Sequence, residues 1–109
     1  MTNEQLLKQL SSFTRAMGLV DTFKKVDEDS YQTYFELGTD YGISLDKEDG
    51  LLYPYYVKYI PGDYWTPPDQ DLVTLGSSKF VEDACELIIK HQLQQVKDDF
   101  AMQRYDEVN

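Results

Sequence analysis

The sequence predicts one α+β domain over residues 1–109. An antiparallel sheet of three to five strands should pack, on one face, against an N-terminal helix and a long C-terminal helix. Apolar residues recur at helical spacing near both ends of the chain, whereas they alternate with polar residues in the middle, between short polar turns. A chain of 109 residues can bury one hydrophobic core and rarely divides into two.

The N-terminal helix is predicted over residues 3–17. Thr2 and Gln5 fit a capping box, because each side chain can satisfy the backbone N–H of the other residue. Four apolar residues follow at steps of four, three and four, and therefore share one face: Leu6, Leu10, Phe13 and Met17. Gly18 favours the end of the helix at this point.

The middle of the chain alternates in polarity as strands do. The predicted strands are Tyr31–Leu37, Tyr41–Leu45, Leu51–Ile60 and Leu72–Leu75. The segment Leu19–Val26 fits either a strand or a loop, and Asp27–Ser30 is predicted to be a turn because it is highly charged. Since alternate residues of a strand face opposite sides, Tyr34 and Tyr56 are predicted on the outer face of the sheet, away from the helices.

The C-terminal helix is predicted from about Lys79 to Arg104, with a serine as its N-cap. Its apolar stripe is Val81, Cys85, Ile88, Ile89, Gln92, Val96 and Phe100. At 1.5 Å per residue this helix would be about 39 Å long, whereas a domain of this size should be about 28 Å across. Its last turns should therefore either project into solvent or pack on another chain.

Charge excludes some partners. The chain has 20 acidic and 10 basic residues, a net charge of -10 and a pI near 4.3. Direct binding to nucleic acid or to anionic membranes is disfavoured, because it depends on Lys and Arg. A small acidic body can imitate a phosphate backbone and be steered to a basic groove, although an acidic surface also serves ordinary solubility.

Little in the sequence indicates catalysis. Cys85 lies within the apolar stripe and is predicted to be a buried, inert thiol, while His91 lies about 240° further around the helix and is predicted to be solvated. Counted from Asp46, the positions that hold glycine and glutamate in a calcium-binding EF-hand loop are Leu51 and Val57. We therefore expect no catalytic residues, no bound metal and no cofactor.

The N-terminus has no basic region followed by a long apolar run, and the apolar runs are too short to span a bilayer. We therefore expect a cytoplasmic protein in a reducing compartment.

A proline-rich loop carries the most distinctive aromatic residues. Pro67 and Pro68 restrict the backbone of Pro61–Asp69, which would limit the entropy lost when Tyr64 and Trp65 are buried by a partner. The 13 residues from Pro61 to Val73 resemble a Pro-Gly-x-Tyr-x-x-Pro-Pro-Asp/Glu segment of small phage-type proteins. That family has no known activity, so the resemblance implies only a phage origin.

These observations predict a non-catalytic module that binds a basic nucleic-acid-binding protein. In its most specific form it would be a phage-encoded inhibitor that mimics nucleic acid and blocks a defence or DNA-processing complex. The candidate phosphate surrogates are Asp46, Glu48, Asp49, Asp63, Asp69 and Asp71, and the candidate anchors are Tyr64 and Trp65. We expect these residues to gather in one outward-facing patch.

Two other functions remain open. The chain could be an assembly or accessory protein that forms a homodimer through its long C-terminal helix and its tyrosine-rich face. A small hydrolase or metal-dependent enzyme that uses paired carboxylates is less favoured, because no recognisable motif supports it.

Overall fold

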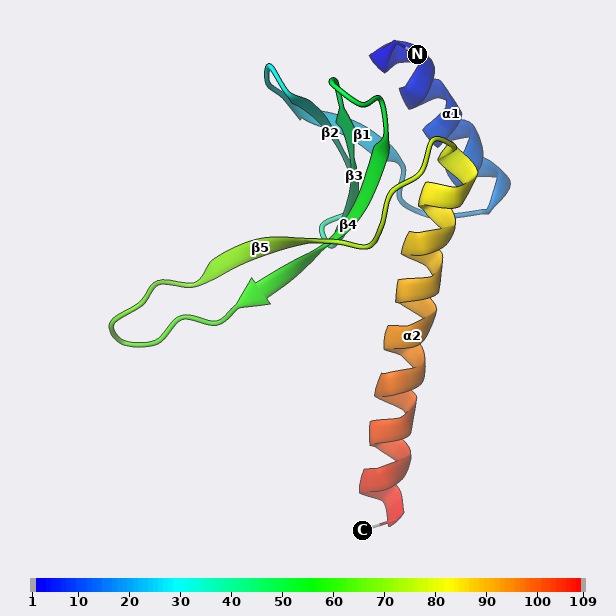
Figure 1. The fold of residues 1–109 in the computed structure, drawn as a ribbon. Helices are drawn as coiled ribbons and strands as arrows, with labels where there is room; N and C mark the ends of the chain where they lie inside the picture. Colours follow the sequence, from blue (N-terminus) through cyan, green and yellow to red (C-terminus); the bar gives the residue numbers. More distant parts are fainter. Residues whose placement is uncertain (1, 109) are drawn as a thin grey trace.

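The computed structural model describes the backbone of residues 2–108 and the side chains of residues 2–102. Within these limits the chain forms two helices and one five-stranded sheet (Figure 1). The elements are α1 (Asn3–Ala16), β1 (Phe23–Glu28), β2 (Gln32–Leu37), β3 (Tyr41–Asp46), β4 (Leu52–Ile60), β5 (Asp69–Thr74) and α2 (Val81–Val108). Both helices lie on the same face of the sheet, which confirms the predicted fold class.

The strands form an antiparallel meander in the order β1-β2-β3-β4-β5. Phe35 lies opposite Ile43, and Ile43 lies opposite Pro54, so these three side chains point toward the helices. Tyr34 and Tyr55 are each next to one of these residues and therefore point to the opposite side. We call this second side the outer face. The sheet curves so that the outer face is concave (Figure 1).

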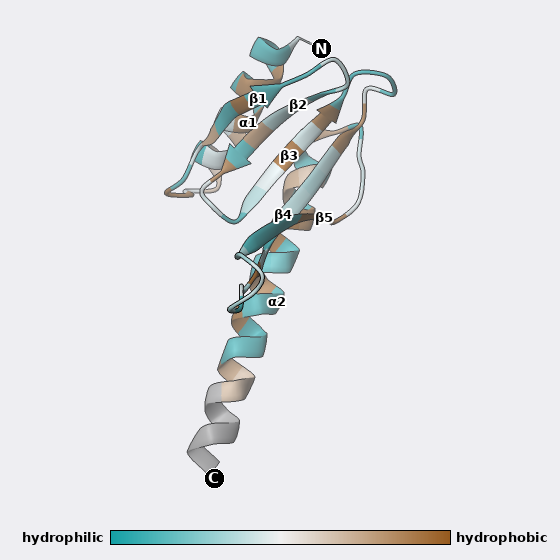
Figure 2. Ribbon diagram, turned by 90° about the vertical axis from the view of Figure 1, so that its left-hand side faces the viewer, coloured by the Kyte–Doolittle hydropathy of each residue, from teal (hydrophilic) through white to brown (hydrophobic). Residues whose placement is uncertain are grey.

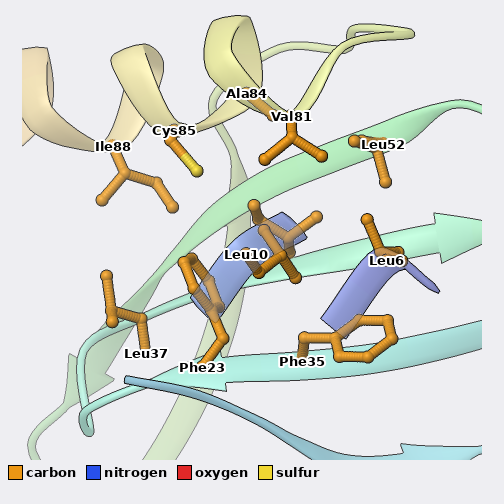
Figure 3. Close-up of a cluster of buried hydrophobic side chains, with 11 residues drawn as sticks. Leu6, Leu10, Phe23, Phe35, Leu37, Leu52, Val81, Ala84, Cys85 and Ile88 are labelled. Carbon is orange, nitrogen blue, oxygen red and sulfur yellow. The ribbon is translucent and has the colours of Figure 1, made fainter. Parts of the chain in front are cut away.

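The hydrophobic core fills the space between the helices and the sheet (Figure 3). Its buried apolar residues are Leu6, Leu10, Phe23, Phe35, Leu37, Ile43, Leu52, Val81, Ala84, Cys85 and Ile88. They come from both helices and from β1 to β4. Since β5 contributes no residue to this cluster in the described part of the chain, β5 is held mainly by its hydrogen bonds to β4.

The first helix begins as predicted and buries a slightly different face. Thr2 and Gln5 form the predicted capping box, with N–H···O distances of 2.9 and 3.1 Å. The helix ends at Ala16, and Gly18 follows with φ at 69°. The prediction that Met17 joins the buried face is wrong, because Met17 lies past the last helical residue and is 52% exposed. Thr14 is buried instead.

The ambiguous segment before residue 27 contains the start of a strand, and the predicted turn at Asp27–Ser30 is wrong for its first half. Asp27 and Glu28 belong to β1, where they pair with Tyr34 and Thr33 of β2. Charged residues are tolerated there because β1 is an edge strand whose side chains, apart from Phe23, are exposed.

The second helix runs from Val81 to Val108, and its 28 residues span about 42 Å. Ser78 lies too early to be its N-cap: its hydroxyl accepts the N–H of Phe80, one residue before the helix begins. Buried side chains occur only up to Ile88 among the described residues of α2. The rest of the helix extends past the sheet, which helps to explain the overall dimensions of 53 × 40 × 22 Å (Figure 2).

The start of this extension is fixed by an aromatic cluster that the sequence interpretation missed. His91 stacks on Tyr56, with ring centroids 4.2 Å apart, and its Nδ1 is hydrogen-bonded to the hydroxyl of Tyr41 at 2.8 Å. Two predictions are therefore wrong. His91 is half-buried rather than freely solvated, and Tyr56 faces the helices rather than the outer side, because it shares the inner face with Pro54.

Candidate functional site

The hairpin of β4 and β5 projects from the body of the protein (Figure 1). The ladder between these strands continues to the pair Ile60–Asp69, beyond the reach of the core. Residues 61–68, which we call the hairpin tip, join the two strands and are all exposed. Tyr64 is 90% exposed and Trp65 is 87% exposed, so the tip presents two large rings to solvent.

The hairpin tip is internally fixed. Asp63 accepts the backbone N–H groups of Trp65 and Thr66 at 2.8 and 2.7 Å, and its own N–H donates to the carbonyl of Thr66 at 2.8 Å. The hydrogen bonds from these N–H groups lower the pKa of Asp63, and the bond from Trp65 has the largest effect. A Cβ on Gly62 would lie 2.5 Å from the Pro68 nitrogen, so only glycine fits this turn. The rings of Tyr64 and Trp65 contact each other edge to face, with their centroids 4.9 Å apart.

A second acidic group lies in the turn between β3 and β4, at residues 46–50, which we call the acidic turn. Asp46 Oδ1 accepts the N–H groups of Glu48 and Asp49. Asp49 accepts the Leu51 N–H at 2.8 Å and the Tyr53 hydroxyl at 2.5 Å. Asp46 and Asp49 thus shape the turn as well as carrying charge.

The structure separates the predicted binding residues into two groups instead of one patch. The acidic turn precedes β4 and the hairpin tip follows it, so the nine residues of β4, at about 3.3 Å each, place them about 30 Å apart. One group is Asp46, Glu48 and Asp49, and the other is Asp63, Tyr64, Trp65, Asp69 and Asp71. Asp69 and Asp71 belong to β5, which begins three residues earlier than predicted. Asp71 lies opposite Lys58, which offsets part of its charge.

The outer face carries a hollow that the sequence interpretation did not identify. Its volume is about 310 Å³, and its lining is Gln32, Tyr34, Ser44, Asp46, Tyr53, Tyr55, Leu72 and Thr74. We call it the tyrosine hollow. Alternation placed Tyr34 on this face correctly, but only the register of four strands reveals that Tyr53 and Tyr55 lie beside it.

The one cysteine and the one histidine of the chain are either buried or engaged by neighbouring side chains. Cys85 is buried, and burial raises the pKa of its thiol to about 12, so it stays protonated near neutral pH and is not a nucleophile. His91 is held between Tyr41 and Tyr56. Among the described residues, no three His, Cys, Asp or Glu side chains are grouped so that they could hold a metal ion.

The described helices include none that is long and apolar enough to cross a membrane. No protein-family model, curated protein or solved structure matches this chain.

Proposed function

We propose that this chain is a non-catalytic protein-binding module that binds a basic protein through the tip of the β4–β5 hairpin. The observation that carries the proposal is the exposure of Tyr64 and Trp65 on a fixed, projecting turn. Residues 59–78 include Asp63, Asp69 and Asp71 but no Lys or Arg, so this segment carries net negative charge, although Lys58 lies opposite Asp71.

The energetics favour the two rings as anchors. Tyrosine and tryptophan dominate binding at protein interfaces because they bury about 150–250 Å² each while keeping a polar atom. At about 25 cal/mol per Å², each ring would contribute about 4–6 kcal/mol before the costs of association are subtracted. The turn formed by Asp63 lowers those costs, since the backbone of Tyr64 and Trp65 is already ordered.

The more specific proposal is that the chain occupies the nucleic-acid-binding groove of its partner. Over 30 Å a DNA duplex carries about 18 phosphates, at one charge per 1.7 Å. The six acidic residues of the two groups supply about a third of that charge, so we assign them to steering and the rings to affinity. The charge excess and the aromatic loop favour a defence or DNA-processing complex as the partner, and the phage origin that the loop's resemblance implies would place that complex in the cytoplasm of a host cell.

The test is capture of the partner by the tagged chain from a lysate of its native host, followed by comparison of variants. Tyr64→Ala/Trp65→Ala should lose the captured protein, because both anchors are gone. Tyr31→Ala is the matched control, since Tyr31 is 75% exposed but lies outside the hairpin. The stability of both variants should stay within about 0.5 kcal/mol of the original chain, as is usual for exposed positions.

Salt and competitor nucleic acid separate the general proposal from the specific one. A hairpin-dependent partner whose retention falls steeply between low and moderate salt supports the acidic contribution. Displacement of the chain by added DNA or RNA supports occupation of the nucleic-acid groove. A partner retained equally by the original chain and the double variant refutes binding through the hairpin.

A second candidate function is self-association through the exposed part of α2. Ile89, Leu93, Val96 and Phe100 recur at steps of four, three and four, which is the seam spacing of a coiled coil. Leu93 is 56% exposed and Val96 is 63% exposed. The tyrosine hollow lies on the opposite side of the sheet from α2, so it would not belong to the same interface.

The mass in solution tests this second function. A concentration-dependent dimer that Leu93→Asp/Val96→Asp converts to a folded monomer supports self-association, because a charge in the seam cannot be buried against a second helix. A chain that sediments as a monomer at every concentration refutes it.

A further inference from the structure

The tyrosine hollow is built from rings that are held in place. The Tyr55 ring lies across Gly42 of the neighbouring strand, in the space that a Cβ would fill. Tyr34 and Ser44 both donate hydrogen bonds to Gln32 Oε1, at 2.6 and 3.0 Å. These contacts order this part of the lining before any ligand enters.

The part of the lining near the acidic turn is also ordered and carries a carboxylate. Tyr53 donates its hydroxyl to Asp49 at 2.5 Å, which fixes the ring. Asp46 lines the hollow directly; its Oδ1 accepts the N–H groups of the acidic turn, and none of the described residues donates to its second oxygen. Tyr55 is only 5% exposed, and its hydroxyl makes no hydrogen bond to any described residue. The hollow therefore offers acceptors that the protein itself does not use.

Nearby carboxylates contribute, after burial or a hydrogen bond, to raising the pKa of each of the three tyrosines. The pKa of Tyr34 is raised mainly by burial and then by the charges of Asp29 and Asp27. The pKa of Tyr53 is raised mainly by its hydrogen bond to Asp49, and then by burial and the charges of Asp49 and Asp46. Burial, followed by the charge of Glu36, raises the pKa of Tyr55 to about 12.

Nearby cations are placed so that they do not fill the hollow. Lys47 donates to the backbone carbonyl of Asp29 at 2.6 Å and pairs with Glu28 at 3.0 Å. Lys24 lies opposite Glu36, on the edge strand β1, and is not among the lining residues.

We infer that the tyrosine hollow binds an arginine side chain of the basic partner protein. A volume near 310 Å³ is at the lower limit of ligand pockets, which suits one side chain better than a cofactor. The flat guanidinium stacks on a tyrosine ring and donates several hydrogen bonds, which the Asp46 carboxylate can accept. The inference rests on the proposed function only for the source of the arginine.

A two-dimensional NMR titration of the whole chain with N-acetyl-arginine methylamide tests the inference. Its matched probe is N-acetyl-citrulline methylamide, which has the same shape without the charge. We expect millimolar binding, with shift changes confined to the residues around Tyr34, Tyr53 and Tyr55. The neutral probe should bind about tenfold more weakly.

Two variants locate the site. Tyr53→Leu should weaken arginine binding about tenfold, and Tyr31→Leu, outside both the hollow and the hairpin, should leave it unchanged. Asp46→Asn provides a second variant if Tyr53→Leu does not fold, because the amide oxygen can still accept the N–H groups of the turn. It should also weaken binding severalfold.

Equal binding of the two probes, shift changes elsewhere, or no effect of either hollow variant would overturn the inference. The outcome is separate from that of the capture experiment. Failure to bind arginine would not contradict the proposed contact through the hairpin. Conversely, capture of a partner that does not depend on Tyr64 and Trp65 would not contradict arginine binding in the hollow.

Discussion

Replacing Gly42 with alanine should destabilise the sheet and disturb the tyrosine hollow together. A Cβ at this position would overlap the end of the Tyr55 ring and lie 2.8 Å from the backbone oxygen of Phe35. Either the ring must leave its place or the strands must separate slightly. Adding a methyl group to a well-packed site costs about 1–3 kcal/mol, and in a chain of this length each kcal/mol lowers Tm by about 4 °C.

Urea and thermal unfolding of a double-mutant cycle measure this effect. Gly42→Ala should lower Tm by about 4–12 °C. In a Tyr55→Leu background the same substitution should cost less, because the ring that collides with the new methyl group is absent, and the coupling should be about 0.5–3 kcal/mol. A neutral Gly42→Ala variant, or an equal cost in both backgrounds, would refute the packing of Tyr55 over Gly42.

Two further predictions concern charge and helix anchoring. The pKa of Glu28 is lowered from 4.5 to about 2 by hydrogen bonds from Lys25, which has the largest effect, and from Lys47 and Asn3. The contribution of Glu28 to stability is therefore complete above about pH 4.5 and is lost as the pH falls toward 2. Urea unfolding across this range should show Glu28→Gln less stable than the original chain near neutral pH, with the difference shrinking toward pH 2; a constant difference would contradict the ion-pair account. His91→Ala should cost about 1–3 kcal/mol in thermal unfolding, because one ring stack and one hydrogen bond disappear, whereas the exposed neighbour Lys90→Ala should cost little. Equal stability of these two variants would show that the His91 cluster does not anchor α2.

Periodicity was sufficient where one local pattern determines the structure. The spacing of Leu6 and Leu10 and the pairing of Thr2 with Gln5 depend on residues a few positions apart, and the first helix follows them. The alternation through Thr33, Phe35 and Leu37 likewise placed the core face of β2 correctly. Each of these features depends on residues that lie only a few positions apart in the sequence.

Contacts between segments that are distant in the sequence could not be predicted from such local patterns. His91 is separated from Tyr41 by 50 residues, and nothing near either residue indicates that their side chains meet. Asp27 and Glu28 were assigned to a turn because of their charge, but pairing with β2 overrides local preference.

The candidate site likewise combines features that follow from the local sequence with features that depend on strand pairing. Exposure of Tyr64 and Trp65 followed from a loop sequence rich in proline, and the structure agrees. The expectation of one acidic patch failed because the carboxylates precede and follow a nine-residue strand that holds them apart. The tyrosine hollow required the register of β2, β3, β4 and β5, which depends on pairing along the whole meander.

Binding through the hairpin tip is tested most directly by the accessibility of Trp65 when the partner is bound. Trp65 is the chain's one tryptophan, so a 5-fluorotryptophan label followed by ¹⁹F NMR reports on the hairpin tip alone. We predict that the label in the free chain responds to a soluble paramagnetic quencher and becomes protected in the complex. A label that remains as accessible in the complex as in the free chain would contradict binding through the hairpin.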